Sequence, residues 1–382
     1  MPWTETVPMR ERGRFVSDVG MGFYGMKELC ERYGVSRKTG YKWMKRFEEE
    51  GEAGLEERSR APQRRPGRTV DEVVEAIVAV RKKHPRWGPR KILEVLREVE
   101  PKLELPAAST AGEWLRRAGL VERRGRRARW QHPGRPVSEA TGPNQVWTAD
   151  FKGQFRMRDG VYCYPLTVMD RYSRYLLRCD GRLSTEINGA KAVFERLFRE
   201  VGLPEAIRTD NGEPFASREI HGLTALNVVW LRLGIRHQRI QRGHPEQNGS
   251  HERMHRDLKA ETTRPPGEHL RQQQERFDRF RTIYNTERPH EALSYRKPAS
   301  VWQSPPRQYP ATIGPPEYPG HFEKRLISDT GCFSFKGRFV FLSTVLAHEW
   351  IGLEAVDDGV WSVVYYNVLL ARFDERTFTV HP

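Results

Sequence analysis

Cysteine is scarce in this chain of 382 residues: there are four copies, and no two are spaced as Cys-x-x-Cys. No nearby group of Cys and His residues has the spacing of a structural zinc site. A long apolar run is also lacking, and the first residues show no apolar stretch typical of a secretion signal. These absences exclude a disulfide framework and a membrane span, and they favour a cytoplasmic protein with reduced thiols.

Acidic residues are outnumbered by basic ones, 50 against 65, which gives a formal net charge of +15. Residues 1–141 hold 31 basic and 21 acidic side chains, so they contribute +10 of this excess. A basic N-terminal third is typical of a nucleic-acid-binding protein, although a soluble protein with a high pI is the simpler alternative. The length predicts two to four domains.

Residues 1–60 show the pattern of a helix-turn-helix domain. A helix over residues 24–32 is followed by a turn at 34–36, where Ser36 is a good N-cap for a second helix over 37–50. We expect Tyr41, Met44 and Phe47 to form the inward stripe of this second helix. Its exposed cations would contact DNA in the major groove, unless the segment is a plain helical hairpin with a solvated basic face. They are Arg37, Lys38, Lys42, Lys45 and Arg46.

Residues 69–120 read as a second helical DNA-binding domain. Amphipathic helices are predicted over residues 71–83 and from about 90, and Ser109 or Thr110 could cap a third helix that ends near Arg116 and Arg117. Residues 121–141 have too few apolar side chains to fold alone, so we interpret them as a basic linker that contacts phosphates. Its arginines are Arg123, Arg124, Arg126 and Arg127.

The composition changes at residue 142, where strands begin. Three successive strands are predicted over 145–154, 161–170 and 175–179, then helix and strand alternate up to about residue 303. This order is that of a ribonuclease-H-like α/β core with a mixed sheet. Short apolar runs separated by hairpin signals over 321–382 predict a small C-terminal β-barrel of about five strands.

Three acidic residues stand at the ends of these elements: Asp150 and Asp210 at predicted strands, and Glu252 at the start of a predicted helix. Carboxylates that converge in this way can bind two Mg²⁺ or Mn²⁺ ions, with Asp150 bridging them, and such a pair assists phosphodiester chemistry. From periodicity alone, a lone aspartate in a strand is more often an edge or turn residue.

Four motifs decide between these interpretations. They resemble the integrase-type core of bacterial insertion-sequence transposases, which are relatives of retroviral integrases. The motifs are Val146-Trp-Thr-Ala-Asp-Phe-Lys152, Thr209-Asp-Asn-Gly212, His244-Pro-Glu-Gln-Asn-Gly-Ser-His-Glu-Arg253 and Tyr284-Asn-Thr-Glu-Arg-Pro-His-Glu-Ala-Leu293. The resemblance covers residues 142–303 and implies that Asp150, Asp210 and Glu252 are the catalytic, metal-binding triad of a polynucleotidyl transferase.

The third acid has a rival in Glu246. The 35 residues between Asp210 and Glu246 match the spacing often associated with the family, whereas 41 separate Asp210 from Glu252. We prefer Glu252 because the acid of the family follows the Asn-Gly breaker and starts a helix. Lys259 lies two helical turns further on the same face and could hold a DNA phosphate.

Other polar residues in these motifs have two interpretations each. His244, Asn248 and His251 either orient water or DNA, or cap and line the helix start. Arg288 and its neighbours Asn285 and His290 either contact a phosphate or buttress the core. Asp170, in an acidic-looking turn, reads as structural.

The resemblance implies a nucleoid-associated DNA transposase that binds the terminal inverted repeats of its element. It would cleave 3′ ends and join them to target DNA as a homodimer or larger oligomer. A ribonuclease-H-like nuclease without joining activity and a catalytically inactive DNA-binding repressor are the alternatives. The role of the C-terminal β domain stays open between DNA contact and subunit contact.

Overall fold

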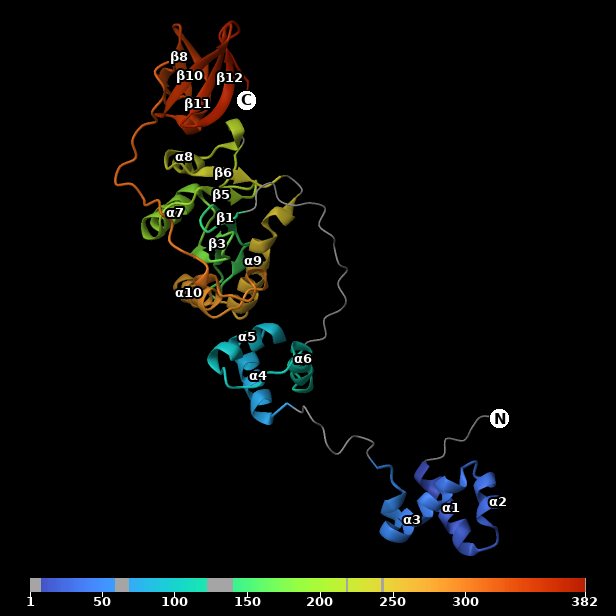
Figure 1. Cartoon of the computed structure of the whole chain (residues 1–382). Coiled ribbons are helices and arrows are strands. Elements are labelled where there is room, and N and C mark those ends of the chain that lie inside the picture. The colour runs from blue at the N-terminus through green and yellow to red at the C-terminus, as the bar shows by residue number, and fades with distance from the viewer. Residues whose placement is uncertain (1–7, 59–68, 122–139, 218, 242–243, 382) are drawn as a thin grey trace. The chain divides into compact units, whose positions relative to one another are not determined.

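The computed structural model describes residues 8–58, 69–121, 140–217, 219–241 and 244–381. Contacts divide the chain into two units, Met1–Arg68 and Thr69–Pro382, which are described separately. Figure 1 shows the order of the elements along the chain.

Three helices and a short 3₁₀ segment form the first unit. Gly34 takes a positive φ of 64° in the turn between the second and third helices, and Ser36 caps the third helix by accepting a hydrogen bond from the Thr39 N–H. The predicted turn and cap are therefore confirmed, whereas the first helix was not predicted. The elements are α1 (Pro8–Met21), α2 (Met26–Arg32), α3 (Arg37–Glu50) and η1 (Gly51–Leu55).

The inward face of α3 differs in part from the predicted one: Met44 is partly buried and packs against the core of this unit as expected. Gly40 and Trp43 are its buried residues, while Tyr41 is 59% exposed and Phe47 is 36% exposed. Gly40 allows the close packing, since a Cβ there would lie 2.8 Å from Cys30 Sγ. The prediction failed because a glycine gives no apolar signal, although here its lack of a side chain lets the helices approach.

A second helical group follows, with bounds α4 (Asp71–Lys83), α5 (Pro89–Val99) and α6 (Ala108–Arg117). Val73 and Ile77 of α4 pack with Leu93 of α5 and Leu115 of α6 in one apolar cluster. Ala107 occupies the N-cap position of α6, so the predicted caps Ser109 and Thr110 were wrong; both lie inside the first turn of the helix.

A six-stranded mixed sheet forms the centre of the second unit, in the order β2-β3-β1-β5-β6 with β4 paired to β3. β1 pairs antiparallel with β3 and parallel with β5, and β5 pairs parallel with β6. This is the mixed sheet of a ribonuclease-H-like core. Its strands are β1 (Val146–Phe151), β2 (Phe155–Arg156), β3 (Tyr162–Asp170), β4 (Leu176–Arg182), β5 (Ala206–Thr209) and β6 (Arg236–Arg239).

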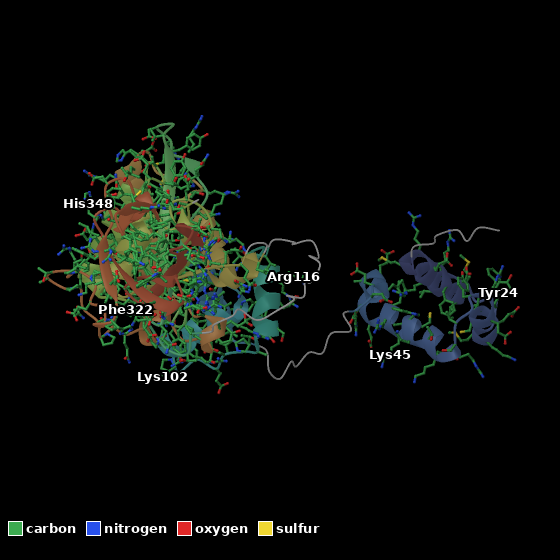
Figure 2. All side chains as sticks on the ribbon, turned by 90° about the horizontal axis from the view of Figure 1, so that it is seen from above. Tyr24, Lys45, Lys102, Arg116, Phe322 and His348 are labelled. Atoms are coloured by element: carbon green, nitrogen blue, oxygen red, sulfur yellow. The ribbon has the colours of Figure 1, made fainter. Side chains whose placement is uncertain are left out.

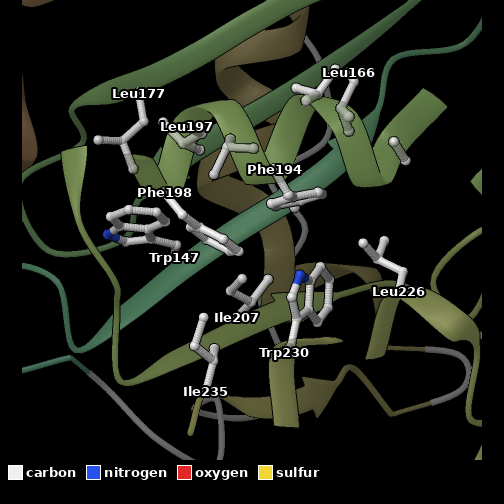
Figure 3. Packing of buried hydrophobic residues seen from close by; sticks show 14 of the residues in the cluster. Trp147, Leu166, Leu177, Phe194, Leu197, Phe198, Ile207, Leu226, Trp230 and Ile235 are labelled. Carbon is white, nitrogen blue, oxygen red and sulfur yellow. The ribbon is translucent and has the colours of Figure 1, made fainter. Parts of the chain in front are cut away.

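Helices cover both faces of this sheet. On one face Trp147 and Ile207 pack with Phe194 and Phe198 of α7 and with Trp230 of α8, as Figure 3 shows. On the other face Met169 and its neighbours pack against α9 and α10. Side chains alternate between the two faces along β1, so Thr148 and Asp150 point away from the Trp147 cluster. The helices are α7 (Ile187–Val201), α8 (Ala225–Arg232), α9 (Gly249–Thr262) and α10 (Leu270–Thr286).

Two separate sheets make up the C-terminal β region. A five-stranded sheet runs in the order β13-β12-β11-β10-β7, and β8 pairs only with β9. A closed barrel would need its end strands to pair, so the predicted barrel is not confirmed, and the sheet is open. The strands are β7 (Glu323–Leu326), β8 (Cys332–Phe335), β9 (Arg338–Phe341), β10 (Trp350–Asp357), β11 (Val360–Tyr365), β12 (Val368–Asp374) and β13 (Thr379–His381).

Membrane-spanning helices were not expected from the sequence. Among the residues that the structure describes, no helix combines the length and apolar character needed to cross a bilayer.

Candidate active site and DNA-binding surfaces

Two adjacent parallel strands bring Asp150 and Asp210 to the same edge of the sheet. Thr148 of β1 pairs with Arg208 of β5, and two residues further along this register are Asp150 and Asp210. Asp210 follows directly after the last residue of β5, and its Oδ1 accepts a hydrogen bond of 3.1 Å from the Gly212 N–H. The turn after β5 therefore orients this carboxylate at the strand end.

Glu252 lies in the first turn of α9 and is exposed. Lys259 lies in the last turn of the same helix, also exposed, seven residues further and hence on the same face. The side chain of Glu246 lies outside the described residues, so the choice between these two glutamates stays a prediction.

The three acids share one electrostatic environment. Burial raises the pKa of Asp150 to about 7, and the negative charges of Asp210 and Glu252 add to this rise, while Lys152 opposes it. A carboxylate that is desolvated and lies near two other negative charges is stabilised when it binds a proton or a cation. The charge distribution at Asp150 therefore fits a bound divalent metal ion.

A complete ligand cage is not preformed. In the described part of the chain, no three His, Cys, Asp or Glu side chains lie together closely enough to hold a metal ion. Mg²⁺ commonly uses only one or two protein carboxylates and completes its octahedron with water and substrate phosphate oxygens. The observed arrangement suits this mode of binding, in which the substrate contributes ligands.

Behind Asp150 lies a buried polar network that the sequence did not reveal. Thr167 Oγ1 lies 2.6 Å from His251 Nε2, 2.7 Å from His255 Nε2 and 3.0 Å from the carbonyl oxygen of Asp150. Thr148 Oγ1 lies 2.7 Å from His251 Nδ1. His251 was singled out in the sequence, but His255 and the two threonines were not; the available signal was the His-x-x-x-His spacing on α9.

Thr148 Oγ1 also donates to the Met169 carbonyl at 3.2 Å, and Thr167 Oγ1 donates to the Asp150 carbonyl. The rings of His251 and His255 contact these two hydroxyl groups. His255 Nδ1 lies 3.6 Å from Asp150 Oδ2, beyond hydrogen-bond distance. The network thus links α9 to β1 and β3 and ends beside the Asp150 carboxylate.

The motif that begins at the end of α10 supports the fold. Asn285 is buried, and its side chain accepts from the Leu176 N–H at 2.8 Å and donates to the Leu176 carbonyl at 3.0 Å. Asp170 is also buried and accepts hydrogen bonds from the N–H groups of Asn144 and Ser173, both at 2.8 Å. Both residues are therefore structural, as was expected for Asp170.

The cations predicted on α3 are accessible. Arg37, Lys38, Lys42 and Lys45 are exposed and Arg46 is partly buried; Lys45 is labelled in Figure 2. The ammonium of Lys42 lies 4.4 Å from the Trp43 ring centroid, and the guanidinium of Arg46 lies 5.1 Å from it. These cation–π contacts hold the two side chains against the helix without neutralising their charge.

The other arginines predicted to contact DNA lie on α6 and in the linker that follows it. Arg116 and Arg117 are exposed on α6, and each pairs with Glu113, at 2.6 Å and 3.0 Å. Exposed pairs of this kind are weak, so a phosphate could replace the carboxylate. The linker arginines 123, 124, 126 and 127 lie outside the described residues.

Comparison with known families identifies the class of the protein. Residues 140–245 and 233–298 match two families that are both described as Integrase core domain. Residues 11–63 match a Helix-turn-helix domain, and residues 39–115 match a Homeodomain-like domain. The chain is therefore similar to integrase core domains over residues 140–298 and to helix-turn-helix domains before them, a combination that supports DNA binding.

Curated relatives include two proteins of insertion elements. The chain is 32% identical over 192 residues to an uncharacterized protein of insertion element IS407 from Burkholderia multivorans, covering 48% of this chain and 65% of the relative. It is 29% identical over 239 residues to an uncharacterized protein of insertion element IS476 from Xanthomonas euvesicatoria, covering 58% of this chain and 62% of the relative. The chain thus spans slightly less than two-thirds of both relatives.

Among solved structures, the magnesium complex of the HTLV-2 integrase catalytic core shows 16% identity and a TM-score of 0.32. That similarity covers 43% of this chain and all of the viral core. The family and insertion-element matches by themselves support the recognition of an insertion-sequence transposase with an integrase-type core.

Proposed function

We propose that this protein is a DNA transposase that cleaves the 3′ ends of its element and joins them to target DNA. The observation that carries the proposal is the position of Asp150 beside Asp210 on adjacent parallel strands, with the charges of both Asp210 and Glu252 acting on Asp150. The integrase-core match supplies the reaction class, which is polynucleotidyl transfer.

In this proposal Asp150, Asp210 and Glu252 would hold a pair of Mg²⁺ or Mn²⁺ ions. When bound, the ions would activate the attacking water or 3′-hydroxyl and neutralise charge at the scissile phosphate. The residues of the chain do the positioning: Thr167 binds the backbone carbonyl of Asp150, and the turn after β5 orients the Asp210 carboxylate. Lys259 would hold a neighbouring DNA phosphate on the Glu252 face of α9.

The N-terminal helices would supply recognition of the DNA ends. The exposed cations of α3 suit contact with phosphates and with guanine edges in the major groove, and Arg116 and Arg117 suit contact with the backbone. Because joining requires two element ends to be held together, the active form would be a homodimer or a larger oligomer. Its DNA partners would be the terminal inverted repeats and the target duplex.

A strand-transfer assay tests the proposal. The substrate is a duplex that ends in the inverted repeats bounding the gene, supplied uncut and with pre-cut 3′ ends, together with a supercoiled target plasmid and Mg²⁺. Cleavage and joining by the unaltered protein, both lost in Asp150→Asn, would support a transposase. Cleavage without joining would favour the nuclease, and DNA binding without either activity would favour the repressor.

A further inference from the structure

A cavity of about 330 Å³ adjoins the first turn of α9, on the side of that helix away from Glu252. Ser250, Arg253 and Asp257 of α9 line it, whereas Glu252 and Lys259 lie on the roughly opposite face of the helix. Two further arginines line the cavity: Arg174 from the turn before β4 and Arg288 from the segment after α10. Segments distant in sequence therefore bring guanidinium groups to one cavity.

Several hydrogen-bonding groups of this cavity are buried without a partner. Arg288 is 6% exposed, and its terminal nitrogens pair with Asp257 and Glu261, yet its Nε lacks an acceptor. Arg174 Nη1 and Ser250 Oγ are likewise buried and unpartnered. His290 Nε2, in the same wall, is also buried and unpartnered. Buried polar groups are normally hydrogen-bonded, so four unpartnered ones in one wall indicate a missing ligand.

The charges in the wall indicate that this ligand is an anion. Burial lowers the pKa of Arg174, and the nearby carboxylate of Asp170 already accepts hydrogen bonds from Asn144 and Ser173. Asp257 and Glu291 also line the cavity, but Asp257 is paired with Arg288. The unsatisfied groups at Arg174 and Arg288 are N–H donors, and phosphate oxygens are their natural acceptors.

A second cavity of about 310 Å³ shares Arg174 and is also lined by Arg171 and Arg296. Among the residues that the structure describes, no carboxylate contributes to its lining. Two basic cavities that meet at one arginine suit successive phosphates along a strand better than they suit one small ion.

We propose that Arg174, Arg288 and Ser250 form a phosphate-binding site for the backbone of a DNA strand, on the face of α9 opposite the acids. This inference rests on the proposed DNA transposase function and extends it, because it gives the core a second DNA contact beyond Lys259. It needs neither metal nor catalysis, so it can be tested independently of cleavage.

The experiment compares the full-length protein with Arg174→Gln and with the control Arg271→Gln. Arg271 is a suitable control because its side chain on α10 is 88% exposed and lies outside both cavities. Binding to a random-sequence duplex is measured by fluorescence anisotropy over a series of salt concentrations, without divalent metal. Thermal unfolding is measured without ligand and with inorganic phosphate.

The expected result is about a tenfold loss of affinity in Arg174→Gln, with a salt slope lower by about 0.9, the value for one lost phosphate contact. Its melting temperature without DNA should stay equal or rise, because an unpaired buried cation has been removed. Arg271→Gln should keep the wild-type slope. Ser250→Ala, which keeps all charges, should lose affinity without losing stability and covers the case in which Arg174→Gln does not fold.

Wild-type salt dependence in Arg174→Gln would overturn the proposal. If inorganic phosphate stabilises the wild type but not the variant while DNA binding is unchanged, the site takes a free anion, and the proposal for DNA is likewise overturned. If Arg174→Gln lowers the melting temperature and leaves DNA binding unaltered, Arg174 stabilises the fold and does not contact DNA. Loss of strand transfer alone, with these binding results as expected, would count against the proposed function and not against this site.

Discussion

Nδ1 of His255 lies 3.6 Å from Oδ2 of Asp150. This contact is not a salt bridge at neutral pH, because burial and the neighbouring groups His251 and Lys152 hold the pKa of His255 well below its usual range. The neutral ring therefore lies beside the carboxylate without neutralising it. The negative charges of Asp210 and Glu252 near Asp150 therefore favour the binding of a cation there.

Replacing Asp150 by Asn should abolish metal-dependent DNA processing without reducing stability. The substitution removes a buried charge that Asp210 and Glu252 repel, so the melting temperature should stay equal or rise by a few degrees. Mg²⁺ should raise the melting temperature of the wild type and leave that of Asp150→Asn unchanged, because a ligand stabilises only the form that binds it. Differential scanning fluorimetry with and without Mg²⁺ measures both effects.

Asp159→Asn is the matched control for this substitution. Asp159 is exposed in the turn before β3, and its Oδ1 accepts a hydrogen bond of 3.0 Å from the Val161 N–H, which Asn can also accept. An equal response of the control and Asp150→Asn to Mg²⁺ would mean that the metal binds elsewhere.

Replacing Thr167 by Val should destabilise the core, although the two side chains have nearly the same shape. The hydroxyl of Thr167 contacts ring nitrogens of both His251 and His255, and its loss leaves buried nitrogens without a partner. The expected cost is about 1–3 kcal/mol in the free energy of unfolding. Urea denaturation of both proteins measures it.

Thr286→Val serves as the control for Thr167→Val. Thr286 is exposed at the end of α10, and its hydroxyl donates only to the Thr282 carbonyl at 2.8 Å among the contacts described. The control should lie within about 0.5 kcal/mol of the wild type. A cost for Thr167→Val no larger than that of the control would show that the network does not stabilise the core.

The sequence predicted the core sheet because its strands carry strong local signals. The apolar runs ending at Asp150 and Asp210 predicted two strands that each end at a carboxylate. The parallel pairing of β1 with β5, which brings the two carboxylates together, was not predicted, because β2, β3, β4 and α7 lie between these strands in the sequence. The Thr148–His251–Thr167–His255 network was not predictable in this way. It depends on how α9 crosses β1 and β3, which is a matter of tertiary packing.

Two other predictions, the inward face of α3 and the C-terminal barrel, differ from the structure for simple physical reasons. The apolar residues of α3 suggested a stripe through Tyr41, but the buried face is the one that carries Gly40, where absence of a side chain permits contact. Hairpin signals near the C-terminus predicted individual strands well, yet closure of a barrel depends on whether the end strands pair. Local turns do not determine that pairing.

The packing at Gly40 gives a third prediction: Gly40→Ala should destabilise the first unit by about 1–3 kcal/mol. The added methyl group would lie 2.8 Å from Cys30 Sγ and 2.9 Å from Phe15 Cζ, so one of the helices must shift. Hydrogen exchange of the amides in α1, α2 and α3 of the full-length protein measures this change locally.

Gly13→Ala in α1 makes the same chemical change where space is available. No atom lies within 4 Å of a Cβ built at Gly13. Because alanine is the better residue in a helix interior, this control should slow exchange and stabilise α1 by roughly 0.5–1 kcal/mol. Equal exchange in the two variants would mean that α3 does not pack tightly at Gly40.

The final prediction concerns His237 in β6, whose pKa is lowered to about 4, mainly by burial and further by Arg239. Its Nε2 lies 2.9 Å from Thr209 Oγ1. The folded protein keeps this ring neutral, whereas the unfolded chain takes up a proton near pH 6.5, so the stability from His237 is complete above that pH. It is lost as the pH falls from about 6.5 to about 4. Between pH 7 and pH 5 the loss should be roughly 1–2 kcal/mol.

His237→Gln should reduce the difference between the unfolding free energies measured in urea at pH 7 and pH 5 by this amount. His348→Gln, at an exposed histidine, should leave the wild-type difference unchanged, since a group in contact with water gains little from folding. The contrary result is that His237→Gln keeps the full wild-type difference in unfolding free energy between pH 7 and pH 5. Other buried histidines would then account for that difference, and the His237 ring would be accessible to protons in the folded state. The comparison therefore tests whether the edge strand beside β5, and with it the position of Asp210, is shielded from solvent.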